Sequence, residues 1–141
     1  MRNGITRIPV RREMRSRKAW LCNALGMLMI LAGIQHFSDP MMYEPFIPET
    51  WPKNAITYLS GAVEIGLGVG VFLSRFRTMA TLGILILMIA FLPLHVVDVF
   101  REVPAIGSKL LAYIRLPIQF VLIAWAWLVY LHARTAAASS A

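Results

Sequence analysis

Four long apolar tracts run along the chain, separated by short polar segments. Each is close to the roughly 20 apolar residues with which a helix crosses the hydrocarbon core of a bilayer. Helices are expected there because the backbone in lipid must satisfy its own hydrogen bonds, and the strict alternation of a barrel strand is absent. The pattern predicts an all-α, integral membrane four-helix bundle. The expected spans are about residues 19–36, 54–74, 78–100 and 109–133.

The spans form one predicted domain over residues 19–134, preceded by a basic arm at 1–18 and followed by a tail at 135–141 that we expect to be disordered. A basic arm before an apolar tract is also typical of a secretory signal peptide. Asn23 lies inside this tract and no Ala-x-Ala cleavage pattern follows it, so we expect it to be retained. Composition agrees with lipid exposure, since 58% of residues are hydrophobic and 15% charged, against roughly 25% charged in soluble domains.

Loop charges predict the orientation of the spans. Ten of the fourteen Lys and Arg residues fall in the arm, in the turn holding Arg75 and Arg77, and at Arg134. Cations are enriched in cytoplasmic loops, so we expect both termini to be cytoplasmic. The partner expected for the basic arm is an anionic lipid surface. Nucleic-acid binding is not expected, because basic and aromatic residues do not alternate elsewhere.

The loop between the first two spans, residues 37–53, is rich in proline and aromatic residues. Proline interrupts helices, so this segment is not expected to form a long one. Aromatic rings suit the membrane interface, and we expect the loop to lie across the outer mouth of the bundle. An ordinary surface loop is the alternative.

Polar side chains inside the spans are the candidate functional residues. Glu64 lies near the middle of its span, where an ionised carboxylate costs several kcal/mol unless it is paired or protonated. Ser60 is one turn away on the same helix face. Arg115 is the partner that the spacing favours, because its length lets it reach towards Glu64. Gln119 lies one turn deeper than Arg115 on the same face.

Two histidines and an aspartate extend this group: His36 ends the first span, and His95 and Asp98 lie near the outer end of the third. The candidate cluster is therefore His36, Ser60, Glu64, His95, Asp98, Arg115 and Gln119. It is expected either to bind a ligand in a cavity shared by all four helices or to fix the helix register by tight packing. No metal site is expected, because His-x-x-x-His and Glu-x-x-His spacings are absent.

The first apolar tract contains a cysteine, and the second contains several glycines. Cys22 is the one cysteine of the chain, and we interpret it as a buried apolar residue. Gly66-x-x-x-Gly70, with Gly61 and Gly68, predicts close approach of neighbouring helices inside the bundle.

At these same positions the chain resembles the DoxX-like family of small four-span membrane proteins. The matching stretches are Ala32-Gly33-Ile34-Gln35-His36-Phe37 with Pro40, residues 43–48 with Trp51-Pro52, Ser60-Gly61 with Glu64-Ile65, and Arg115-Leu116-Pro117-Ile118-Gln119 with Trp125. The chain departs from the family at Pro93-Leu94-His95, where many members have Pro-Ala-Asn. The resemblance implies a four-helix bundle in the plasma (bacterial inner) membrane. Family members include subunits of a thiosulfate:quinone oxidoreductase and proteins that accompany redox or stress-defence systems.

The function expected from the residues and the resemblance together is a non-catalytic accessory subunit of a quinone-linked redox or stress-response system. Quinone is then the candidate ligand, and a redox protein the candidate partner. Two alternatives stay open: a scaffold or assembly factor for another membrane protein, and a carrier or enzyme for a small lipophilic molecule. Catalytic activity of its own is not expected, since no nucleophile with its base, phosphate loop or complete metal site is present.

Overall fold

The computed structural model describes the backbone of residues 10–138, with side chains from Ala19 onward. This part of the chain is helical and contains no strand. Its elements are α1 (Val10–Ser38), η1 (Pro40–Met42), η2 (Glu44–Phe46), α2 (Lys53–Phe72), α3 (Arg77–Phe100) and α4 (Lys109–Ala138). The side chains of the basic arm, residues 1–18, lie outside the described residues.

All four α-helices are long and apolar enough to cross a membrane, which fits a multi-pass membrane protein. The apolar part of α1 runs over Ala19–Ser38, and α2, α3 and α4 qualify over their whole lengths. The four predicted helices are present, with bounds within a few residues of those expected except at the start of α1, which continues back to Val10, and at the C-terminus. That they cross a membrane stays a prediction. At the C-terminus α4 continues to Ala138, so the expectation of disorder from residue 135 was wrong for residues 135–138. These residues are mostly alanine, the strongest helix former, and they extend the helix by propensity.

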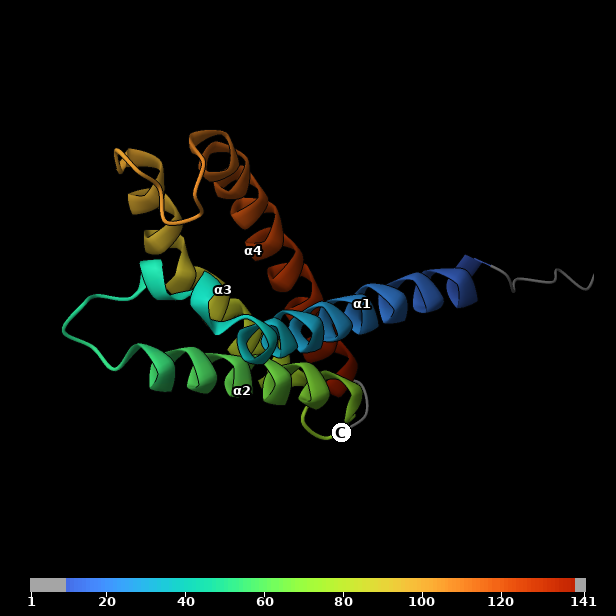
Figure 1. The fold of residues 1–141 in the computed structure, drawn as a ribbon. Helices are drawn as coiled ribbons and strands as arrows, with labels where there is room; N and C mark the ends of the chain where they lie inside the picture. Colours follow the sequence, from blue (N-terminus) through green and yellow to red (C-terminus); the bar gives the residue numbers. More distant parts are fainter. Residues whose placement is uncertain (1–9, 139–141) are drawn as a thin grey trace, which may run out of the picture.

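The helices form two antiparallel hairpins, α1–α2 and α3–α4, and each hairpin packs more extensively within itself than against the other. Contact between the hairpins is made mostly by α2 and α3, while α1 and α4 touch over a short stretch. In Figure 1 the hairpins cross and diverge towards the end that carries residues 39–52 and 101–108, which we call the outer end. The α2–α3 turn and the end of α4 lie at the opposite, inner end.

Four glycines form the seam of the first hairpin, Gly26 and Gly33 on α1 against Gly61 and Gly68 on α2. A Cβ on Gly33 would lie 2.7 Å from the carbonyl oxygen of Gly61, and one on Gly68 would lie 2.7 Å from that of Gly26. These glycines are seven residues apart on each helix, two turns, and so share one face. The missing side chains let the two backbones touch, as small residues do in membrane bundles.

The prediction of close helix approach at Gly61, Gly66, Gly68 and Gly70 is confirmed at three of these glycines and is wrong at Gly66. Gly66 faces open space, since no atom lies within 4 Å of the position that its Cβ would take, and a Cβ on Gly70 would meet Ala80 of α3 at 2.9 Å. Four-residue spacing makes Gly66 and Gly70 look like one motif. The contacting pair on α2 is instead Gly61 and Gly68, and their partners on α1 have the same spacing.

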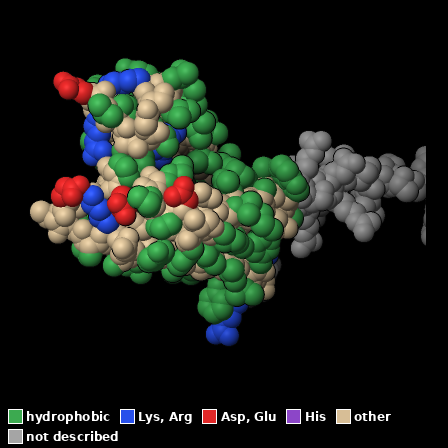
Figure 2. Space-filling view, viewed as in Figure 1, with side chains coloured by type: hydrophobic (Ala, Val, Ile, Leu, Met, Phe, Trp, Pro, Cys, Tyr) green, Lys and Arg blue, Asp and Glu red, His purple; other side chains and the backbone are tan. Residues whose placement is uncertain are grey.

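The apolar core fills the inner half of the bundle. Its largest fully buried side chains include Leu25 and Met29 of α1, Val71 of α2, Ile84 of α3 and Val129 of α4. Cys22 is buried in the same cluster, as the sequence predicted. Apolar side chains also cover much of the outside, and Figure 2 shows most of the visible charged groups gathered at the outer end. The inner half is thus closed by packing, and the buried ionisable side chains His36, Glu64 and Asp98 lie towards the outer end.

The glycine seam predicts a sharp contrast between two alanine substitutions. Gly33→Ala places its Cβ against backbone atoms of α2 that cannot rotate away, so we expect destabilisation of about 1–3 kcal/mol, typical of overpacking. Gly66→Ala, the matched control, should leave stability unchanged or raise it, because its methyl meets open space and alanine favours helix. Thermal unfolding of both variants in the same detergent measures the difference. Equal losses would contradict the seam.

Candidate functional site

A cavity of about 170 Å³ lies at the outer end, between the two hairpins. Residues from all four α-helices and from the loop between α1 and α2 line it. They are His36, Tyr43, Phe46, Ile47, Ile56, Thr57, Ser60, Phe91, Leu94, His95 and Arg115. Apolar walls with a few convergent polar groups are the usual composition of a small-molecule site.

The loop of residues 39–52, which we call the roof, covers this cavity. Its two short 3₁₀ turns each carry a proline in the first turn, Pro40 in η1 and Pro45 in η2. Proline's fixed φ suits the start of a helical turn, while its missing N–H opposes a longer helix. The turns direct Tyr43, Phe46 and Ile47 to the cavity. The expectation that this loop lies across the mouth of the bundle is confirmed.

Two aromatic rings of the roof each hold a polar side chain from a different hairpin. The ring of Tyr43 stacks on His36 of α1, with centroids 3.6 Å apart and an interplanar angle of 17°. The ring of Phe46 lies under the guanidinium of Arg115 from α4, whose central carbon is 4.8 Å from the ring centroid. That arrangement is a cation–π contact. The roof therefore positions one nitrogen-bearing side chain on each side of the cavity.

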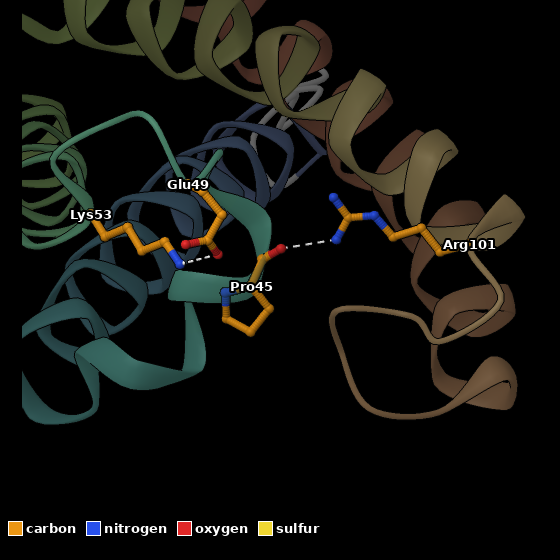
Figure 3. A network of polar contacts seen from close by, with 4 residues as sticks. All are labelled: Pro45, Glu49, Lys53 and Arg101. Carbon is orange, nitrogen blue, oxygen red and sulfur yellow. Dashed lines mark hydrogen bonds and ion pairs between the residues drawn. The ribbon is translucent and has the colours of Figure 1, made fainter.

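Polar contacts at the rim attach the roof to its surroundings (Figure 3). Arg101, at the end of α3, donates a hydrogen bond of 2.9 Å from Nη1 to the carbonyl oxygen of Pro45. At the other end of the roof, Lys53 Nζ lies 2.7 Å from Glu49 Oε1, which links the roof to the start of α2. Exposed contacts of this kind are individually weak. Together with the two ring contacts they connect the roof to both hairpins.

Glu64 contacts His36, with 3.5 Å between Glu64 Oε1 and His36 Nε2 and both side chains buried. This is an ion pair when the imidazole is protonated. The glycine seam makes the contact possible, because a Cβ on Gly61 would lie 2.6 Å from the Cβ of His36. Close backbone approach thus brings His36 within reach of the next turn of α2. Glu64 itself is not among the residues lining the cavity.

The sequence prediction that Arg115 is the partner of Glu64 was wrong. Within the described residues Arg115 forms no ion pair, and its guanidinium lies against Phe46. The spacing along α4 predicted the depth of Arg115 in the bundle but not the direction of its long side chain. An arginine near a helix end can extend towards the interface instead of deeper into the bundle.

The other predicted residues divide into two groups. Ser60 and His95 line the cavity. Asp98 and Gln119 are buried elsewhere and make structural hydrogen bonds. Asp98 Oδ1 accepts from the backbone N–H of Ala105, which fixes the α3–α4 loop. Gln119 Nε2 donates to the carbonyl oxygen of Met88 over 2.7 Å and ties α4 to α3.

Sequence reasoning missed the rings of the site. The pattern places Tyr43 and Phe46 at the membrane interface, and it does not single out Phe91, yet all three line the cavity. The proline-rich composition of the roof was a signal that it folds back on the bundle. Nothing in the one-dimensional pattern indicated which ring would meet which polar side chain.

Several buried polar atoms around the cavity have no hydrogen-bond partner among the described residues. They include Nδ1 of His36, Oγ1 of Thr57 and Nη1 of Arg115, each on a residue that lines the cavity. Buried polar atoms in proteins are nearly always satisfied, so such a group calls for an explanation. Glu64 Oε2, Asp98 Oδ2 and Trp125 Nε1 are also buried without a partner in this part of the chain, but these residues do not line the cavity. Unused hydrogen-bonding capacity is therefore present at the cavity on three of its lining residues.

Tyr43 adds a further donor. Burial raises the pKa of its phenol, and the negative charge of Glu64 raises it as well, against an opposing effect of Arg115. A tyrosine titrates near pH 10 without such effects, so this phenol stays protonated at neutral pH. Its hydroxyl can therefore donate a hydrogen bond to an acceptor.

This geometry defines the chain as a helical bundle with a roofed, mostly apolar cavity at one end, where a few polar side chains converge. Residues 25–130 match the family model described as a domain of unknown function (DUF8561), and the chain belongs to that family. The match includes the roof and every residue that lines the cavity. No curated protein and no solved structure matches the chain.

The contact between His36 and Glu64 predicts a non-additive pair of mutations. Removing either partner leaves the other buried and uncompensated, so His36→Leu and Glu64→Leu should each cost a few kcal/mol of stability. The double variant should lose less than the sum of the two. A thermal-stability double-mutant cycle in detergent measures the coupling.

The control cycle combines Glu64→Leu with Arg115→Leu. Because these residues form no ion pair, their losses should add to within about 0.5 kcal/mol. Stronger coupling of Glu64 to Arg115 than to His36 would contradict the observed pairing.

Proposed function

We propose that this protein binds a lipophilic molecule whose head is a small ring that accepts hydrogen bonds, and that this molecule is a quinone. In this proposal it acts as a non-catalytic accessory subunit of a quinone-linked redox system in the plasma membrane. The observation that carries the proposal is the presence of unpartnered polar atoms around an otherwise apolar cavity, on His36, Thr57 and Arg115. Quinone carbonyls are acceptors and would match donors placed there.

The size of the cavity favours a single ring. An apolar protein cavity of roughly 150 Å³ is large enough to bind benzene, and the volume here is about 170 Å³. A one-ring head fits this space, and an alkyl tail would then extend outside it. The ring contacts already present, through Tyr43, Phe46 and Phe91, suit the flat face of such a head.

An accessory role agrees with the side chains at the site. Cys22 lies in the inner-half core, apart from the cavity. The groups at the cavity hold and orient an occupant, and a partner protein would supply the electron transfer. The resemblance to DoxX-like proteins, some of which are subunits of a quinone-reducing enzyme, supports the same role.

Quinone binding is tested by Thr57→Val, which keeps the side-chain shape and removes the hydroxyl. Because Thr57 Oγ1 has no partner among the described residues, the apoprotein should be as stable or more stable after the change. Affinity for decylbenzoquinone in nanodiscs should fall by roughly five- to tenfold if the hydroxyl donates to the head. Thr81→Val is the matched control, since Thr81 is equally buried but bonds to carbonyls of its own helix.

The same protein, purified in mild detergent and extracted with organic solvent, should release quinone detectable by mass spectrometry. Absence of quinone from the extract, together with no saturable decylbenzoquinone binding, would refute the proposal. A protein that co-purifies without quinone would favour the assembly-factor alternative.

The proposed orientation places both termini in the cytoplasm and the roof on the outer side, because cations are concentrated in the arm, the α2–α3 turn and the tail. A reporter active only in the periplasm should therefore be silent when fused after Arg134. The same reporter inserted into the roof should be active. Activity of the C-terminal fusion would overturn the orientation.

A further inference from the structure

Arg115 is the permanent cation among the residues that line the cavity, and no carboxylate lines it. We infer that the site selects an anionic ring head over a neutral one, with Arg115 as the residue that makes this selection. The inference rests on the proposed function and narrows it to lipophilic monocyclic weak acids. Alkylated benzoates belong to this class, as do quinones that carry an acidic hydroxyl.

Two buried carboxylates, Glu64 and Asp98, are not among the residues that line the cavity, and each is engaged through one oxygen while its other oxygen has no hydrogen-bond partner among the described residues. Glu64 contacts His36, and Asp98 accepts a hydrogen bond from the backbone of Ala105. Neither forms an ion pair with Arg115 within the described residues. No described carboxylate therefore touches this guanidinium, although the charge of Asp98 acts on it from a longer distance.

The surroundings of Arg115 leave one side of it available. The guanidinium carbon lies 4.8 Å from the centroid of the Phe46 ring, while Nη1 is buried and has no hydrogen-bond partner in the described part of the chain. Guanidinium N–H groups point outward in the plane, so a stacked ring does not satisfy them. An anion in the cavity would receive charge-assisted hydrogen bonds, which are about twice as strong as neutral ones.

The other titratable groups at the cavity do not oppose an anion there. His36 lines the cavity and contacts Glu64, which is not among the lining residues. His95 adds an imidazole, and Tyr43 adds a protonated phenol. A charge left without a partner inside a membrane protein is costly, so an anionic head bound beside Arg115 also removes that cost.

Two ligands of matched shape but different charge measure the effect of ligand charge on binding. Para-decylbenzoate and para-decylbenzamide have the same ring, tail and shape, but at neutral pH only the first is an anion. Binding of each labelled probe is measured by equilibrium dialysis against protein in zwitterionic nanodiscs, with empty nanodiscs subtracted. We expect the benzoate to bind at least roughly tenfold more tightly than the benzamide, the preference of a charge-assisted bond over a neutral one.

Three variants test whether Arg115 causes the preference for the benzoate over the benzamide. Arg115→Gln should reduce the benzoate-to-benzamide affinity ratio to about one, and Arg115→Lys, which keeps the charge, should retain part of it. Arg75→Gln removes an exposed cation at the inner end and should leave the ratio unchanged. Size-exclusion profiles and melting curves verify that each variant is folded, and the lysine variant keeps the test decisive if the glutamine variant is unstable.

The outcomes separate this inference from the proposed function. If decylbenzoquinone and the benzamide bind as tightly as the benzoate, the cavity is a binding site but anion selection is refuted. A preference that persists in Arg115→Gln would refute the role of Arg115. If neither probe nor decylbenzoquinone binds saturably, the proposed function fails and this inference with it.

Discussion

The buried carboxylate of Glu64 is the constraint on which the rest of the outer half depends. A charge at that position in an apolar bundle needs a partner, and the structure supplies His36 from the neighbouring helix. That contact requires α1 and α2 to approach at backbone distance, which the glycine seam allows. Once His36 is fixed, its ring is the platform on which Tyr43 stacks, so the position of the roof follows from the pairing of one acid.

The roof joins the two hairpins in the outer half, as the apolar core joins them in the inner half. In the inner half, side chains such as Leu25, Ile84 and Val129 close the space between the hairpins. In the outer half the hairpins diverge, and residues of the roof bridge them through stacking on His36, cation–π contact with Arg115 and a hydrogen bond from Arg101. A cavity remains between these contacts because rings and long polar chains span the gap without filling it.

Much of this arrangement could be predicted from the sequence, and the limits have a physical origin. Hydropathy fixes which segments are long and apolar enough to span a membrane, and helical rise fixes the depth of each polar residue, so the spans and the outer-half location of His36, His95 and Arg115 were predictable. Side-chain direction was not. Arg115 is long enough to reach either Glu64 or the roof, and the choice depends on the Phe46 ring, which comes from a different element.

The glycine seam shows the same limit in another form. Gly66 and Gly70 have the spacing of a familiar packing motif, yet the seam uses Gly61 and Gly68 because those two face matching glycines on α1. Complementarity depends on both helices, so the sequence of one helix does not show which of its glycines face glycines on the other. The position of a candidate site residue was predictable where it depended on depth in the bundle. It was not predictable where it depended on a contacting residue from another element.

The central claim, that the polar groups at the outer end surround space for a lipophilic occupant, is tested most directly by a high-resolution structure of the protein in native lipid nanodiscs. We expect non-protein density inside the cavity, within hydrogen-bond distance of Arg115 Nη1 and His36 Nδ1. A structure in which protein side chains fill that space and satisfy both nitrogens would contradict it and leave the cluster a purely structural role.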